Sequence, residues 1–141
     1  MAITTTAEIA QRLTANSSML TTHATDANIA VGNASLDAIA GNGGACNIAI
    51  GKSALSAATT GCENVAIGRA AADALTTGST NVAIGLNALG VQTTGGTNNV
   101  AIGSGAYGAS VNDGSNGIAI GTGALGAGDV SGGHNIAMGY R

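Results

Sequence analysis

The chain contains no Phe, Trp or Pro, and its only aromatic residues are Tyr107 and Tyr140. Because aromatic side chains supply much of the buried area of compact globular cores, a core of Ala, Val, Ile and Leu must be thin and regular. The 24 glycines without any proline exclude collagen and indicate many tight turns. Only 8% of the residues are charged and the mean hydropathy is positive, which argues against intrinsic disorder.

Charge and long apolar runs are also scarce. The net charge of -3 comes from 7 acidic residues and 4 basic ones, namely Arg12, Lys52, Arg69 and Arg141. Four scattered cations cannot form a groove that follows a phosphate backbone, so we expect no nucleic acid partner. No apolar run approaches the ~20 residues of a membrane span, and the N-terminus lacks the pattern of a signal peptide. We therefore expect no membrane insertion, and synthesis and folding in a cytoplasm.

A repeated phrase fills most of the chain. Residues 81–90 read NVAIGLNALG, residues 99–108 read NVAIGSGAYG, and alignment on the glycine gives seven copies spaced 17 to 19 residues apart. Helical repeats need about 33 residues or more, whereas this period suits one turn of a β-solenoid or β-roll. The copies end at Gly32, Gly51, Gly68, Gly85, Gly103, Gly121 and Gly139.

Each copy alternates a large, a small and a large apolar residue, as in Val82, Ala83 and Ile84. Side chains of a strand point alternately to opposite faces, so the two large residues share one face. We predict that this face fills the core and that the alanine face allows another surface to approach closely. The predicted core and trimer ladder consists of Ile29, Val31, Ile48, Ile50, Val65, Ile67, Val82, Ile84, Val100, Ile102, Ile118, Ile120, Ile136 and Met138.

Two further ladders follow from the same alignment. An apolar position four residues after the glycine predicts a second apolar ladder, at Leu36, Leu55, Ala72, Leu89, Tyr107 and Leu125. The asparagine that opens the phrase could stack from copy to copy, each amide bonding to the next, at Asn28, Asn47, Asn64, Asn81, Asn99 and Asn135; Gly117 replaces it in the sixth copy. A coil of about 18 residues encloses little volume, so we expect several chains, most simply three, to share a core.

Residues 1–27 precede the first copy and differ from the repeat region, residues 28–141. Thr5 and Glu8 have capping-box spacing, which predicts a short helix over residues 7–15. Two interpretations stay open: a cap over the end of the β-stack, or a docking segment for a larger assembly. The residues proposed for partner contact are Ile3, Ile9, Arg12, Leu13, Met19 and Leu20.

The phrase N-[IV]-A-I-G, with an apolar residue four positions later, resembles the head repeat of YadA-type trimeric autotransporter adhesins. It is also similar to NVAIG repeats of tailed-phage fibre and capsid-surface proteins. The resemblance covers residues 28–139 and implies an all-β fold, a left-handed parallel β-roll in a homotrimer. The adhesins continue into a coiled-coil stalk and a membrane β-barrel, which this sequence does not contain.

Few residues suggest chemistry. GTGALG at 121–126 fits the letters of a dinucleotide-binding motif but has no βαβ context. Cys46 and Cys62 lie nearly one repeat apart, so a disulfide is conceivable, although their unequal places in the repeat and a cytoplasmic setting favour free thiols. His134 is best explained as an exposed turn residue, with a metal or anion site on a trimer axis as the alternative. Asp113 and Asp129 are best explained as turn formers, with Ca²⁺ ligation as the alternative.

The sequence therefore predicts a protein without enzymatic activity, cofactor or structural metal. We expect a homotrimeric decoration (cement) or short head-fibre protein on the virion surface of a phage, attached to the major capsid protein through residues 1–27. The alternative is a tail fibre or adhesin head whose loops bind a glycan or protein of the host surface.

Overall fold

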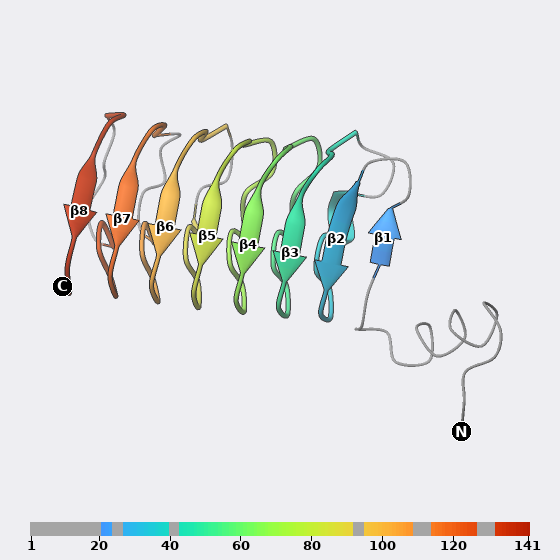
Figure 1. Ribbon diagram of the computed structural model, residues 1–141, viewed down its shortest axis with the longest axis horizontal. Helices are drawn as coiled ribbons and strands as arrows, with labels where there is room; N and C mark the ends of the chain where they lie inside the picture. The colour runs from blue at the N-terminus through green and yellow to red at the C-terminus, as the bar shows by residue number, and fades with distance from the viewer. Residues whose placement is uncertain (1–20, 24–26, 40–42, 92–94, 109–113, 127–131) are drawn as a thin grey trace, which may run out of the picture.

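The computed structural model describes residues 21–23, 27–39, 43–91, 95–108, 114–126 and 132–141. In these ranges the chain is an all-β solenoid whose strands stand in one row, with the C-terminus beside the last strand (Figure 1). One 3₁₀ turn, η1 (Asp37–Ile39), follows the second strand. The strands are β1 (Thr21–His23), β2 (Asn28–Val31), β3 (Ile48–Ile50), β4 (Val65–Ile67), β5 (Val82–Ile84), β6 (Val100–Ile102), β7 (Ile118–Ile120) and β8 (Ile136–Met138).

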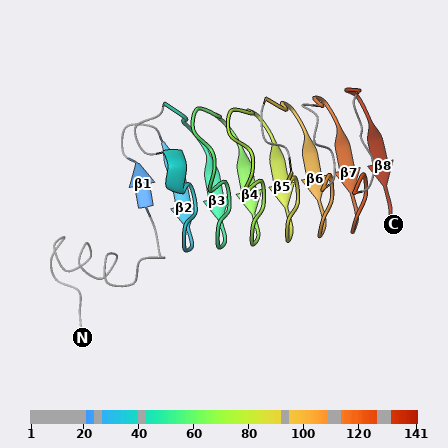
Figure 2. The same cartoon turned by 180° about the vertical axis from the view of Figure 1, so that it is seen from behind.

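The strands β2 to β8 each coincide with one copy of the repeated phrase, and each pairs in parallel with the next. The register places equal positions opposite one another, so that Ala66 pairs with Ala83 and Ile67 with Ile84. Seen from behind, the same row of strands is joined by turns of similar shape (Figure 2). The predicted parallel β-solenoid built from seven repeats is confirmed.

The first strand differs from the rest because β1 pairs antiparallel with β2, Thr22 opposite Ile29. A strand in this position covers the outer edge of β2, as a cap of the stack would. The helix predicted over residues 7–15 lies outside the described residues. Within the described ranges, no helix has the length and apolar content needed to cross a membrane.

The interior of the solenoid is formed by small side chains from the strands and larger ones from the opposite wall. The central alanines are buried, with 0% of Ala66 and 1% of Ala83 exposed. Leu55, Leu89 and Tyr107 face them from the second ladder and are fully buried. The predicted second apolar ladder is confirmed in these turns.

The predicted roles of the two strand faces were wrong. We expected Val and Ile to fill the core and Ala to lie at an interface, but Ala66 is fully buried and Ile67 is 37% exposed. The alanines form one buried cluster with the leucines of the second ladder, and a close-packed interior of this kind accommodates extra methyl groups poorly. The alanines therefore form the core of the single chain, and the larger residues form its outer face.

The asparagine ladder is present from Asn28 to Asn99, but Asn135 does not join it, because Gly117 interrupts the column and Asn135 Nδ2 donates to the Gly132 carbonyl instead. Asn81 Nδ2 donates to Asn64 Oδ1 at 3.1 Å and to the Gly96 carbonyl at 2.8 Å. The Asn81 backbone N–H also donates to Asn64 Oδ1, at 3.0 Å. Equivalent bonds join Asn64 to Asn47 and Asn47 to Asn28. These amides are buried and satisfy backbone groups at the corner of each turn, which would otherwise be costly to bury.

The glycine that ends each strand is required for two reasons. Gly85 has φ +130, a conformation that L-residues rarely adopt. A Cβ built on Gly85 would also lie 2.7 Å from the carbonyl oxygen of Gly103 in the next turn. The same relationship links Gly68 to Gly85, at 2.5 Å. Glycine therefore allows both the bend and the close stacking of successive turns.

Candidate functional site

The most prominent surface feature is an apolar strip along the outer face of the sheet. It is made of the two large residues of each phrase, stacked by the parallel register into two columns. We call it the apolar face. Its columns are Ile29, Ile48, Val65, Val82, Val100, Ile118 and Ile136, and Val31, Ile50, Ile67, Ile84, Ile102, Ile120 and Met138.

These side chains are half-buried or exposed throughout the row. Ile29 is 40% exposed and Ile50 39%, and the values rise to 70% at Ile136 and 73% at Met138 on the last strand. Seven strands at about 4.8 Å give a strip roughly 30 Å long. A continuous apolar strip of this kind on a protein surface typically marks an interaction site.

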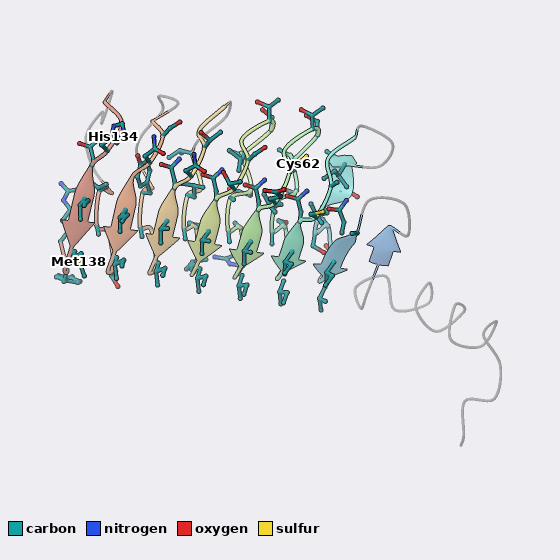
Figure 3. All side chains as sticks on the ribbon, turned by 45° about the horizontal axis from the view of Figure 1, so that its top comes forward. Cys62, His134 and Met138 are labelled. Carbon is teal, nitrogen blue, oxygen red and sulfur yellow. The ribbon has the colours of Figure 1, made fainter. Side chains whose placement is uncertain are left out.

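Two exposed columns border the apolar face, one on each side. We call the residues that precede the asparagines the leading edge, and those that follow the glycines the trailing edge. The described leading-edge residues are Ala27, Cys46, Glu63, Thr80, Asn98, Asn116 and His134, and all have positive φ. The trailing-edge residues are Asn33, Lys52, Arg69, Leu86, Ser104, Thr122 and Tyr140. Figure 3 shows His134 and Cys62 toward one side of the row and Met138 toward the other.

The two cysteines lie in adjacent turns as free thiols, Cys46 exposed and Cys62 half-buried. Cys62 Sγ accepts a hydrogen bond from the Ala45 backbone N–H at 3.4 Å. One turn further, Ser79 Oγ accepts from the Cys62 N–H at 3.0 Å. Cys62 therefore occupies the position of Ser79 in the next repeat. Its thiol accepts a backbone hydrogen bond from the preceding turn, as the Ser79 hydroxyl does.

The other residues singled out for chemistry do not come together. His134 is exposed, and its backbone N–H donates to the Ser115 carbonyl at 3.0 Å. No group of three His, Cys, Asp or Glu suited to a metal ion occurs in the described part of the chain. Asp113 and Asp129 lie outside it, as do Ile3, Ile9, Arg12, Leu13, Met19 and Leu20.

The GTGALG stretch has a structural explanation. Gly121 occupies the strand-ending position, with φ +124, and packs against the backbone of Gly139. Gly123 also has positive φ and lies in the turn that follows β7. These glycines permit the coil to bend and stack, so their spacing does not indicate a nucleotide site.

A shallow hollow lies beside the last strand. Leu125, Ala137, Met138, Tyr140 and Arg141 contribute to its lining. The Arg141 guanidinium is the only charged side-chain group among the residues that form it. One cation beside apolar side chains provides no acid–base pair or nucleophile, so the hollow is no candidate for catalysis.

Sequence reasoning did not anticipate the outward position of the large residues or the charges beside them. Searches against protein-family models, curated proteins and solved structures found no match to this chain. The candidate site is therefore defined by the geometry of the chain itself: the apolar face and the two exposed edges beside it.

Proposed function

We propose that this chain is a structural protein without enzymatic activity, a rod that assembles through the apolar face as a homotrimer. The observation that supports the proposal is the uninterrupted double column of Val, Ile and Met side chains on the outside of a narrow coil. Burying such side chains contributes about 25 cal/mol per Å² of apolar surface. Three coils around a common axis would cover all three faces, and the number three follows the resemblance to trimeric β-roll proteins.

The assembly is tested by its mass in solution. Sedimentation of the full chain is expected to give three times the 13.3 kDa of one chain. A folded monomer at micromolar concentration would contradict the shared-core proposal.

The proposed biological role is decoration of a phage capsid at the virion surface. It rests on the similarity of the NVAIG repeats to capsid-surface proteins and on the arrangement of a non-repeat segment before a rod. Residues 1–27 would attach the rod to the major capsid protein, and the rod would reinforce or extend the surface.

Truncation tests the attachment. A chain lacking residues 1–20 should retain its β-sheet circular dichroism and its oligomeric mass but lose binding to purified virions that lack the protein. Undiminished binding by the truncated, folded oligomer would rule out the anchoring role. A matched control replaces only Arg141, at the opposite end of the chain, and should bind normally.

A second candidate role is a fibre or adhesin head that recognises a glycan or protein on the host surface. The leading edge favours it, because Thr80, Asn98 and Asn116 form an exposed polar column in which Thr80 Oγ1 donates to Asn98 Oδ1 at 2.6 Å. Asn98→Ala and Asn116→Ala should then reduce binding to host envelopes while leaving virion attachment intact. If binding to envelopes is absent in the unaltered protein, the decoration role is favoured.

A further inference from the structure

The two edges of the apolar face carry opposite charges in the same turn. Glu63 stands on the leading edge before β4, and Arg69 stands on the trailing edge after it. Lys52 occupies the trailing edge one turn earlier, and the Ala70 N–H donates to the Lys52 carbonyl at 2.9 Å. All three side chains are exposed. The anionic Glu63 on the leading edge and the cationic Lys52 and Arg69 on the trailing edge thus lie on either side of the central part of the apolar face.

Glu63 and Arg69 are too far apart to neutralise each other within one chain. The extended part of this stretch is β4 (Val65–Ile67), which at about 3.3 Å per residue separates the two edges by roughly 10 Å, beyond ion-pair distance. Within the described residues, no ion pair joins Glu63, Lys52 or Arg69 to another side chain. The charges are therefore available to a molecule that covers the apolar face.

We propose that the occupant of the apolar face is a second copy of this chain, arranged parallel and in register, with Glu63 of one copy opposite Arg69 of the next. This inference rests on the proposed self-association and adds its direction and register. A rotation about an axis along the rod carries the leading edge of one copy to the trailing edge of its neighbour at the same height. An antiparallel pair would instead place leading edge against leading edge, where Glu63 has no Lys or Arg beside it.

The charge pattern also selects the register. In the turns that follow β4, the trailing edge offers Leu86, Ser104 and Thr122, which carry no charge. A slip that moved Glu63 toward these residues would separate it from every trailing-edge cation in the described turns. A slip of one turn in the other direction would place Glu63 opposite Lys52, but a slip repeated around three copies does not close into a ring. Identical apolar rungs cannot distinguish registers, so the charges and the closure of the ring together supply the specificity that the repeat lacks.

Charge reversal is the first experiment. Glu63→Arg and Arg69→Glu should each weaken association at least about tenfold, measured by sedimentation equilibrium at low ionic strength. The double variant Glu63→Arg/Arg69→Glu restores opposite charges between copies and should return to within about threefold of the original dissociation constant. Asp37→Arg changes the net charge as much as Glu63→Arg does. Because Asp37 is exposed and belongs to neither edge, this control should leave association unchanged.

Cysteine crosslinking is the second experiment, and it does not depend on the reversals being tolerated. In a Cys46→Ser/Cys62→Ser background, the double variant Glu63→Cys/Arg69→Cys should form covalent oligomers with a short bis-maleimide. Glu63→Cys alone and Arg69→Cys alone should not. In a parallel assembly only the double variant brings thiols of neighbouring copies together.

The outcomes separate this inference from the proposal on which it rests. If the unaltered chain is monomeric, both are overturned. If it is oligomeric but Glu63→Cys alone crosslinks, the copies are antiparallel, and the self-association stands without the inference. The inference alone is also overturned if neither charge reversal changes the dissociation constant of the oligomer, or if the double variant associates no better than the single variants.

Discussion

The Tyr107 hydroxyl lies where the side chain of residue 117 would begin: a Cβ built on Gly117 would stand 2.5 Å from the Tyr107 oxygen. Tyr107 takes the place of leucine in the second ladder, and Gly117 takes the place of asparagine in the next repeat. The two departures compensate each other, since the larger ring fills the space that the missing amide leaves. The Tyr107 hydroxyl is buried without a hydrogen-bond partner in the described structure, and desolvation raises its pKa.

Exchange of this pair should show strong coupling. Gly117→Asn alone would clash with the Tyr107 ring and should lower the free energy of unfolding by about 2 kcal/mol or more. Tyr107→Leu/Gly117→Asn recreates the pattern of the regular turns and should recover most of that loss. A double-mutant cycle by urea unfolding measures the coupling, and additive effects would contradict the compensation.

Replacing a strand-ending glycine should be severe. Gly85→Ala introduces strain at φ +130 and a Cβ 2.7 Å from the Gly103 carbonyl oxygen, so we expect a loss of about 3 kcal/mol or failure to fold. Gly95→Ala is the matched control, because a Cβ there meets nothing within 4 Å. Thermal unfolding of both variants checks the prediction, and equal melting temperatures would refute it.

The asparagine ladder should contribute strongly to stability. Asn81→Ala leaves the Gly96 carbonyl, Asn64 Oδ1 and the Asn99 N–H without their bonds to this side chain. Asn64 Oδ1 keeps its hydrogen bond from the backbone N–H of residue 81, so two groups are left unsatisfied. Each such buried group costs about 1 to 3 kcal/mol, and we expect a total loss of about 2 kcal/mol or more. Asn33→Ala removes an exposed asparagine and should change stability by less than about 0.5 kcal/mol. Chemical denaturation of the two variants should reveal this difference.

The two faces of a strand should respond oppositely to a change in size. Ala66→Val adds volume to the filled interior and should cost about 1 to 3 kcal/mol. Ile67→Val removes one methylene group from a residue that is 37% exposed and should cost less than about 1 kcal/mol. If unfolding experiments rank the two variants in the reverse order, the alanines are not the core of the chain.

Asp73 should make stability depend on pH in the acidic range. Desolvation by burial raises its pKa above 3.8, although hydrogen bonds from its own backbone N–H and that of Ala74 oppose the shift. The folded state thus holds the proton more tightly, and the stability gained from this group below 3.8 is lost as pH rises through the folded pKa. Asp73→Asn should therefore be more stable than the unaltered protein at neutral pH and nearly equal to it in acid.

Urea unfolding at neutral pH and below the ordinary pKa of aspartate would measure this difference. Asp37→Asn, an exposed carboxyl at the same place in an earlier repeat, controls for the loss of one negative charge. A gain for Asp73→Asn that persists unchanged in acid would show that desolvation of the charge is not its cause.

The repeat itself made most of the fold predictable. Spacing, alternation and the glycine after Ile84 located every strand from β2 to β8, because a bend and a strand are decided by a few neighbouring residues. The ladders at Asn81 and Leu89 followed from the same alignment, since equal positions of a solenoid must stack. The contacts predicted for residues 1–20 remain predictions because that segment lies outside the described residues.

Which face of each strand points inward was decided only by the tertiary structure. Alternation separates Ala66 from Val65 and Ile67 but does not say which side encloses the core. The opposite wall of the same turn resolved this, because Leu75 and the second-ladder residues are buried in one cluster with the strand alanines. The NVAIG phrase by itself determined a strand, a bend and a stack; the narrow cross-section of the coil turned its largest residues outward, where another chain can bury them.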